Sequence, residues 1–323
     1  MHFEKRIVAV GVFVLVASAA FAGDFTIAVS EDLRAYLHDV YQIPMQRIHV
    51  IPNGIDLSLF SPSSQKEPSA AFQILFASRL DADCSLGAEL LCEIAPHLAK
   101  EVSNLRITVA GGGKKMPEIA ERAEKINREV GFCCVSVVGA IEDMPSLLQK
   151  QDVFVGVSRA ALEAVACGCS VILCGNEGYG GILREENFWE ASLSNFCARG
   201  KEAPEAQRLL QDLLLLAHSP ALREESAATC RALLKKEYDA QSVCQQTLAV
   251  YQKNKHVPPR ATVAIGGYFG CGNLGDDAIL QAFIEYTRTH YPDMRVLALT
   301  KHPHKDARRF GVACYNRKNP FAV

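Results

Sequence analysis

The sequence carries almost no net charge and no apolar run long enough for an ordinary membrane-spanning helix. Its 34 Lys and Arg residues nearly balance 36 Asp and Glu, which leaves a formal charge of −2. This balance excludes a broad electrostatic attraction to nucleic acid. The longest apolar run, from Ile7 to Ala22, is shorter than the roughly 20 residues that a transmembrane helix needs. We also find no internal repeat and no low-complexity segment, which excludes solenoid and linker-like chains.

Paired cysteine motifs are missing too, although the chain has 12 cysteines. Cys167-Gly-Cys169 lacks the two-residue gap of a zinc knuckle and has no partner pair, so we expect no metal. Several other cysteines lie inside apolar runs, where buried free thiols in a reducing compartment are a better explanation than disulfides. These are Cys92, Cys133, Cys134 and Cys174.

The N-terminal residues allow two interpretations. Lys5 and Arg6 precede the apolar run, which ends in Ala20-Phe21-Ala22. This order is typical of a secretory signal peptide with a small-x-small cleavage site. The alternative is a buried helix or strand left from an upstream domain.

After Asp24, short apolar segments alternate with amphipathic helical ones. Apolar segments such as "FQILFASRL", "LRITVAGGG", "DVFVGVS" and "SVILCG" are each followed by a helical pattern. This alternation predicts an α/β fold with a doubly wound parallel sheet, similar to a Rossmann fold. The polar stretch "KNKHVPPRA" predicts a linker, and "ATVAIGG" then begins a second α/β unit. At 323 residues the chain has room for about two domains.

Ligands of open α/β sheets bind beyond the carboxyl ends of the strands. Backbone N–H groups at a helix start and a cation such as Arg79 could hold a phosphate there, and a buried Glu163 could accept two hydroxyls of a ribose or sugar. The alternative is that the glycines are only turn residues and that Glu163 pairs with Arg159 one helical turn earlier. The candidate residues at these strand ends are Arg79, Gly111, Gly112, Gly139, Arg159 and Glu163.

Five segments in order resemble the C-terminal half of GT-B glycosyltransferases of the glycosyltransferase 4 type. They are "IAVSEDLRAYL…IHVIPNGID", "ILFASRL", "ITVAGGG", "VVGAIEDMPSLLQKQDVFVGVS" and "ALEAVACGCSVI", and they cover about residues 25 to 251. The resemblance implies a nucleotide-sugar donor site in which Arg79 contacts the phosphates and Glu163 holds the ribose. Backbone near Gly139 would frame the base. It also implies retaining glycosyl transfer without a metal or other cofactor.

Three features depart from this family. Cys84 stands where a second cation, a lysine, is common, and Val155 stands where the family has an earlier glutamate. We also expect the chain to have no counterpart of the N-terminal acceptor-binding domain of GT-B enzymes. We therefore expect no sugar transfer by this chain alone, assign no catalytic residue, and expect an acceptor-domain protein among its partners.

The stretch "GGYFGCGNLGDDAILQAFI" resembles the first strand, loop and helix of polysaccharide pyruvyl transferases. The glycines allow a tight turn and a close approach to a ligand. Asn273 and Asp276 can cap a helix or bind acceptor hydroxyls, and turn-and-cap chemistry alone is the alternative. Phosphoenolpyruvate would be a substrate only with a further half-domain beyond Val323. The site residues predicted by this resemblance are Tyr268, Gly270, Gly272, Asn273, Gly275 and Asp276.

Together these patterns predict a bacterial protein of cell-surface polysaccharide synthesis. Its expected parts are an apolar segment 1–23, a nucleotide-sugar-binding domain 24–252, a linker 253–260 and a partial pyruvyl transferase region 261–323. The expected partners are a nucleotide-sugar donor and a polysaccharide or lipid-linked sugar acceptor, without nucleic acid. We expect a cytoplasmic location, at the inner face of the membrane where its acceptor is lipid-linked; export is the alternative. A non-catalytic sugar-nucleotide-binding or scaffold remnant is the competing function.

Overall fold

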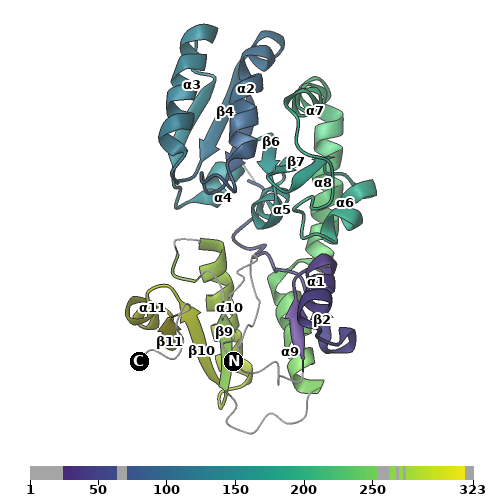
Figure 1. Cartoon of the computed structure of the whole chain (residues 1–323), viewed down its shortest axis with the longest axis vertical. Helices are drawn as coiled ribbons and strands as arrows, with labels where there is room; N and C mark the ends of the chain where they lie inside the picture. Colours follow the sequence, from purple (N-terminus) through teal and green to yellow (C-terminus); the bar gives the residue numbers. More distant parts are fainter. Residues whose placement is uncertain (1–24, 64–70, 254–261, 267–268, 272–273, 317–323) are drawn as a thin grey trace. The chain divides into compact units, whose positions relative to one another are not determined.

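The computed structural model describes residues 25–63, 71–253, 262–266, 269–271 and 274–316 (Figure 1). Their contacts form two compact units. Residues 55–239 make one unit, and the residues before 55 together with those after 239 make the other. The domain bounds expected from the sequence stay predictions, and the segment 1–23 lies outside the described residues.

A six-stranded sheet forms the centre of unit 55–239, in the order β5-β4-β3-β6-β7-β8. Neighbours among the first five of these strands pair in parallel, and β8 runs antiparallel to β7. The strands are β3 (Phe72–Ala77), β4 (Leu105–Ala110), β5 (Val135–Gly139), β6 (Val153–Gly156), β7 (Ser170–Gly175) and β8 (Gly178–Ile182).

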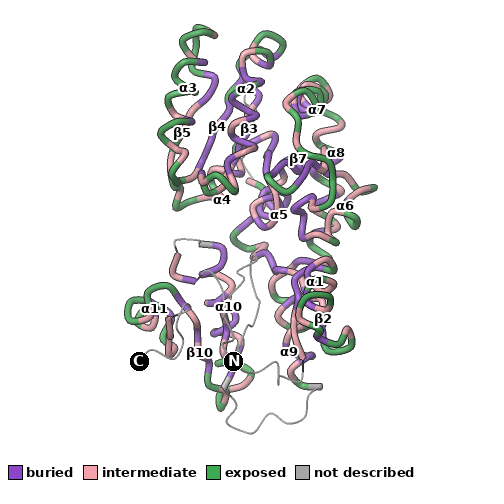
Figure 2. Tube along the Cα trace, viewed as in Figure 1, coloured by how far each residue is buried: buried purple, intermediate pink, exposed green. Residues whose placement is uncertain are grey.

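Helices cover both faces of this sheet. Side chains alternate along β3, so Ile74 and Phe76 pack against α2, α3 and α7, whereas Leu75 packs with α4, α5 and α8. The central strands β6 and β7 are accordingly buried while the outer helix faces are exposed (Figure 2). This confirms the predicted doubly wound α/β fold. The helices are α2 (Leu86–Glu101), α3 (Met116–Val130), α4 (Met144–Leu148), α5 (Ser158–Ala166), α6 (Glu185–Ser192), α7 (Ala206–His218) and α8 (Pro220–Glu237).

The antiparallel strand β8 and helix α6 are additions that the sequence did not predict. "GYGGI" has three glycines and resembles a turn, yet it pairs with β7 from Gly175 to Ile172. Helix α6 is short and is fixed by Phe188, which is fully buried and lies edge-on to Phe196 and Tyr238. Tertiary packing overrides the weak local preference in both elements.

The other unit contains two small parallel sheets. β1 (Thr26–Ala28) pairs with β2 (Ile48–Val50), and α1 (Glu31–Tyr41) connects them with a short 3₁₀ helix, η1 (Met45–Arg47). β9 (Thr262–Gly266), β10 (Arg295–Thr300) and β11 (Ala313–Asn316) form a sheet in the order β11-β10-β9, connected by α10 (Leu274–His290) and α11 (Pro303–Phe310). Helix α9 (Ala240–Lys253) also belongs to this unit.

Among the described residues, no helix is both long and apolar enough to span a membrane. All 12 cysteines lie in the described part of the chain and are free thiols. Cys92, Cys134 and Cys174 are buried as predicted. Cys133 is exposed instead and lies two residues before β5 begins.

Candidate functional site

The predicted donor-site residues gather at the carboxyl edge of the six-stranded sheet. The Ser78 amide donates to the Ala110 carbonyl at 3.1 Å, and the Gly111 amide donates to the Gly139 carbonyl at 2.6 Å. These two bonds bring together the segments that follow β3, β4 and β5. Because β6 is parallel to β3, the start of α5 meets the same edge.

Backbone packing explains the glycine at position 111. Its φ is +141°, and a Cβ there would lie 1.8 Å from the Ser78 carbonyl oxygen. Gly112 differs, because a Cβ at that position would meet nothing within 4 Å. The Gly111 amide is engaged by Gly139, so the turn is held by the protein itself in this structure. Gly139, with a φ of +71°, ends β5 at the same edge.

Arg79 extends into solvent and is held by two carboxylates. Its side chain is 63% exposed, and its guanidinium lies 3.5 Å from Asp81 and 3.2 Å from Asp83. Desolvation pushes the pKa of Asp83 upward, but the Arg79 charge and the hydrogen bonds to the carboxylate together outweigh it and hold that pKa below its usual range. Burial raises the pKa of the nearby Cys84 thiol despite Arg79, so the thiol stays protonated. Cys84 therefore supplies no charge in place of a lysine.

A second cation that the sequence reasoning missed lies beside the glycine turn. The Lys115 ammonium donates to Glu89 at 2.6 Å, and the Ser85 hydroxyl donates to the same oxygen at 2.6 Å. The hydrogen bond from Lys115 is the largest influence on Glu89 and holds its pKa below the ordinary value. The Lys115 amide also donates to the Leu80 carbonyl at 2.8 Å. Two lysines directly after "GGG" were the available signal.

Arg159 and Glu163 form a buried pair on α5, as the alternative interpretation of the sequence expected. Nε of Arg159 donates to Oε1 of Glu163 at 2.8 Å, and the residues are 8% and 9% exposed. Burial raises the pKa of Glu163, and the Arg159 charge opposes that shift. One carboxylate oxygen is thus engaged by a neighbour on the same helix.

A backbone segment from another part of the chain closes over the start of α5. The Ser158 amide donates to the Phe196 carbonyl at 2.9 Å, and the Asn195 amide group donates to the Ser158 hydroxyl at 3.0 Å. Ser158, Asn195 and Phe196 have φ values of +58°, +54° and +56°. Such backbone is strained for non-glycine residues and is typical of sites where the fold imposes a conformation. No sequence pattern pointed to this contact.

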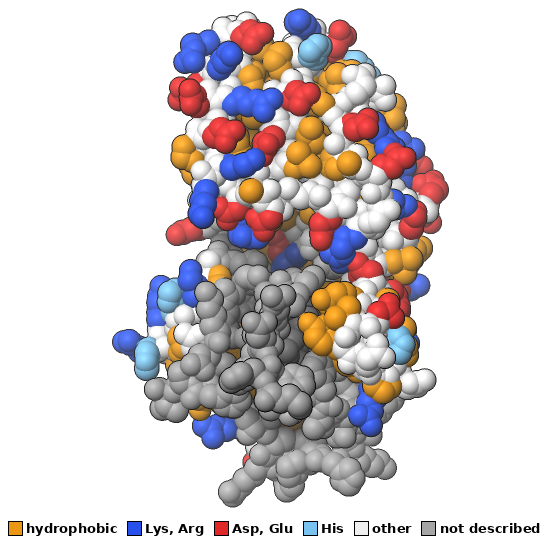
Figure 3. Space-filling view, in the orientation of Figure 1, with side chains coloured by type: hydrophobic (Ala, Val, Ile, Leu, Met, Phe, Trp, Pro, Cys, Tyr) orange, Lys and Arg blue, Asp and Glu red, His pale blue; other side chains and the backbone are white. Residues whose placement is uncertain are grey.

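The position expected to carry a second carboxylate is filled by Val155, which is fully buried in β6. No group of three or more potential metal ligands occurs among the residues that the structure describes. On the visible face of unit 55–239, Lys and Arg are interspersed with Asp and Glu (Figure 3). That face therefore presents no broad patch of positive or of negative charge.

Part of the second predicted site lies outside the described residues, namely Tyr268, Gly272 and Asn273. Gly270 has a φ of +70°, and a Cβ there would lie 2.1 Å from an Asp306 oxygen. Asp277 anchors the turn by accepting from the Gly270 amide at 2.9 Å and from Arg309 at 2.5 Å. Gly275 and Asp276 are buried in the first turn of α10. The sequence reasoning thus missed Asp277 as the residue that fixes this loop.

Comparisons with known proteins find related sequences. Residues 71–202 match the family model described as Glycosyl transferases group 1, and residues 6–59 match Glycosyltransferase Family 4. EpsF of Bacillus subtilis, which is named as a glycosyltransferase, is 30% identical over 159 residues. The match covers 45% of this chain and 41% of EpsF. Alpha-maltose-1-phosphate synthase of Mycolicibacterium smegmatis is 25% identical over 259 residues, 73% of this chain and 65% of that protein.

Solved structures share the fold. A glycosyltransferase from Rickettsia africae has a TM-score of 0.57 and 17% identity, covering 73% of this chain and 65% of that one. HepE from Anabaena, in complex with UDP, has a TM-score of 0.55 and 17% identity. The match covers 71% of this chain and 64% of HepE. The chain thus spans less than two thirds of these relatives. Residues 71–202 thus match the group 1 glycosyltransferases in sequence, and the described part of the chain shares the α/β fold of solved GT-B glycosyltransferases.

Proposed function

We propose that the carboxyl edge of the six-stranded sheet binds the nucleotide part of a nucleotide-sugar donor for retaining glycosyl transfer. The observation that carries the proposal is the convergence of Arg79, the Gly111–Gly113 turn and the start of α5 on this edge, inside the segment that matches group 1 glycosyltransferases. The structures of HepE with UDP and of the pneumococcal O-GlcNAc transferase GtfA with UDP and GlcNAc support a uridine donor.

In this proposal each residue has a separate role. Arg79, whose ion pair with Asp83 is exposed to solvent, supplies positive charge to the diphosphate. Lys115, one turn from the glycines, provides a second charge in place of the lysine that Cys84 replaces. Glu163 accepts ribose hydroxyls through the carboxylate oxygen that Arg159 does not engage. The backbone at Gly139 lies beside the base.

The acceptor is a polysaccharide or a lipid-linked sugar in this proposal, and transfer requires an acceptor-binding domain opposite the donor edge. Such a reaction belongs to cell-surface glycan synthesis on the cytoplasmic side, where nucleotide sugars are made. The competing proposal is a non-catalytic sugar-nucleotide-binding or scaffold protein. It is favoured by Val155 in place of the family's earlier glutamate.

Hydrogen exchange in the presence of UDP-glucose and UDP-GlcNAc tests the donor proposal. We expect slower exchange in residues 78–84, 111–116 and 156–163, and unchanged exchange in β8 and α6. A second assay supplies an acceptor-binding partner domain and a polymer extract and measures glycosyl transfer. Slower exchange in the three segments without any glycosyl transfer in that assay would favour the scaffold function. Absence of protection in all three segments would reject both.

We further propose that residues 261–323 form the opening of a polysaccharide pyruvyl transferase domain, which would use phosphoenolpyruvate with a further half-domain. The support is the strand β9, the turn with Gly270 and the helix α10 with buried Asp276 in the expected order. Here the turn binds hydroxyls of the acceptor sugar. Addition of the acceptor glycan should slow amide hydrogen exchange in the first turn of α10 of the wild-type protein. The same addition should leave exchange in the Asp276→Asn variant unchanged.

A further inference from the structure

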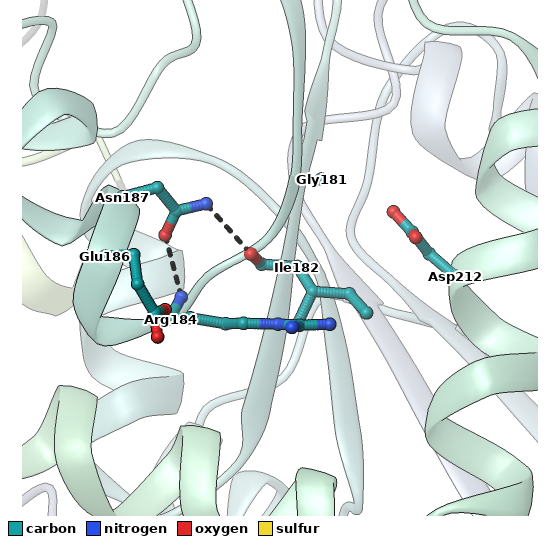
Figure 4. Close-up of a pocket in the computed structure, with 6 residues that line it drawn as sticks. All are labelled: Gly181, Ile182, Arg184, Glu186, Asn187 and Asp212. Atoms are coloured by element: carbon teal, nitrogen blue, oxygen red, sulfur yellow. Dashed lines mark hydrogen bonds between the residues drawn. The ribbon is translucent and has the colours of Figure 1, made fainter.

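Unit 55–239 carries a hollow that the donor site does not use (Figure 4). It measures about 400 Å³ and lies between the end of β8, the start of α6 and helix α7. Ile182 pairs with Ile172, near the amino end of β7. The hollow is therefore near the amino edge of the sheet, on the side away from the proposed nucleotide site. Its lining residues are Gly181, Ile182, Arg184, Glu186, Asn187 and Asp212.

The corner between β8 and α6 is rigid because of Asn187. Its carboxamide oxygen accepts from the Arg184 amide at 2.8 Å, and its NH₂ group donates to the Ile182 carbonyl at 2.9 Å (Figure 4). Both ends of the Asn187 side chain are thus used to hold the backbone. Its role at the hollow is to position the side chains of Arg184 and Glu186.

Asp212 faces the hollow from α7 with a fixed orientation (Figure 4). The buried Tyr179 hydroxyl donates to its Oδ2 at 2.6 Å. Burial raises the pKa of Tyr179, so the hydroxyl keeps its proton and remains a donor. The second oxygen of Asp212 is left to accept a hydrogen bond from a ligand.

Arg184 and Glu186 carry charges that form no ion pair with any residue in the described part of the chain. The lining of the hollow thus contains one guanidinium with five N–H donors and two carboxylates. The two carboxylates would repel an anion, and the guanidinium would repel a metal cation. A neutral ligand with hydroxyls, which both donate and accept, satisfies all three groups.

Helix α6 also carries an aromatic ring that lies outside the lining of the hollow and packs edge-on against Phe188. Trp189 is 48% exposed and follows Glu186 by three positions on α6, so the two side chains are neighbours on the helix surface. The face of an indole ring is electronegative and attracts the C–H edges of a sugar ring. The same helix therefore offers a stacking surface and a hydrogen-bonding carboxylate.

We propose that this hollow binds a neutral saccharide through Arg184, Glu186 and Asp212, with Trp189 stacked on the sugar ring. The choice of a glycan as ligand rests on the proposed function, since a polysaccharide synthesis protein meets glycan chains. The site would hold a part of a chain remote from the donor edge, and so retain a polymer between transfer events.

The chain has a single tryptophan, so its fluorescence reports on Trp189 alone. The experiment titrates the full chain with maltohexaose, cellohexaose and chitohexaose and follows tryptophan emission, with calorimetry as a second readout. We expect a saturable response to at least one hexasaccharide. Arg184→Ala, Glu186→Gln and Asp212→Asn should each weaken binding about ten-fold, the loss of one charged hydrogen bond.

Arg106→Ala, an exposed arginine on β4, is the control and should bind like wild type, with circular dichroism confirming the fold of every variant. No saturable heat or emission change with any hexasaccharide, a response to inorganic phosphate instead, or binding unaffected by the three substitutions would overturn the proposal. UDP is titrated in parallel. UDP binding without saccharide binding rejects this site alone, whereas saccharide binding without UDP binding rejects the donor proposal alone.

Discussion

Nε of Arg159 and Oε1 of Glu163 lie 2.8 Å apart on α5, and both side chains are about nine-tenths buried. A buried ion pair adds little net stability, but removal of one partner leaves an uncompensated charge in the interior. The pair therefore constrains the helix that carries the proposed ribose contact. It links the stability of α5 to the chemistry of the donor edge.

The first prediction concerns this pair. Glu163→Gln should lower the free energy of unfolding by about 3–5 kcal/mol, because Arg159 keeps its charge. Urea denaturation measures the change. The control is Glu124→Gln, which removes an exposed pair with Arg128 on α3 and should cost under about 0.5 kcal/mol. Equal losses in the two variants, or a greater loss in Arg159→Leu/Glu163→Leu than in Glu163→Gln, would contradict this account.

The glycine turn gives a second prediction. Gly111→Ala should destabilise the protein by about 2–4 kcal/mol, since its φ is positive and the added Cβ would overlap the Ser78 carbonyl. Gly112→Ala is the matched control and should change stability by less than about 0.5 kcal/mol, because nothing lies near its Cβ. Thermal and urea unfolding of the two variants provide the comparison. Similar stabilities would show that the turn can relax away from β3.

The third prediction is a pH dependence. Lys115 and Ser85 hold the pKa of Glu89 below its ordinary value of 4.5. Stabilisation from a depressed carboxyl pKa is complete above the unfolded value and disappears as the pH falls through the folded value. As the pH is lowered from 6 to below 4.5, the free energy of unfolding should therefore fall more for wild type than for Glu89→Gln. The control is Glu93→Gln, an exposed residue on the same helix, whose stability should depend on pH as that of wild type does. If wild type and Glu89→Gln lost stability equally as the pH falls, Glu89 would not contribute to the pH dependence.

A fourth prediction follows from the carboxylates around Arg79. Asp83→Asn removes one competitor for the guanidinium, so nucleotide affinity should rise about two- to five-fold, the equivalent of one exposed ion pair. Calorimetry with UDP measures this gain. Glu101→Gln, an exposed residue at the end of α2, should leave the affinity unchanged. Weaker binding in Asp83→Asn would mean that Asp83 orients Arg79 rather than competing with a phosphate.

The sequence predicted the parallel strands well because each is a short apolar run followed by a turn residue, as in β3 and β7. It also anticipated the Arg159–Glu163 pair, since residues four apart on a helix are neighbours. The missed features depend on residues distant in the chain. Glu89 and Lys115 are 26 positions apart, and Ser158 and Asn195 are 37 apart. Strand β8 was missed because its glycines form a strand only through pairing with β7.

The most direct test of the central claim is calorimetric titration of the chain with UDP, GDP, ADP and CMP. Wild type is compared with Arg79→Ala, whose exposed side chain can be removed without disturbing the core, and with Arg106→Ala as the control. The account predicts saturable binding of one nucleotide, weakened about ten-fold or more by Arg79→Ala and unchanged by Arg106→Ala. Absence of binding to all four nucleotides, or binding that does not depend on Arg79, would contradict a donor site at the carboxyl edge of the sheet.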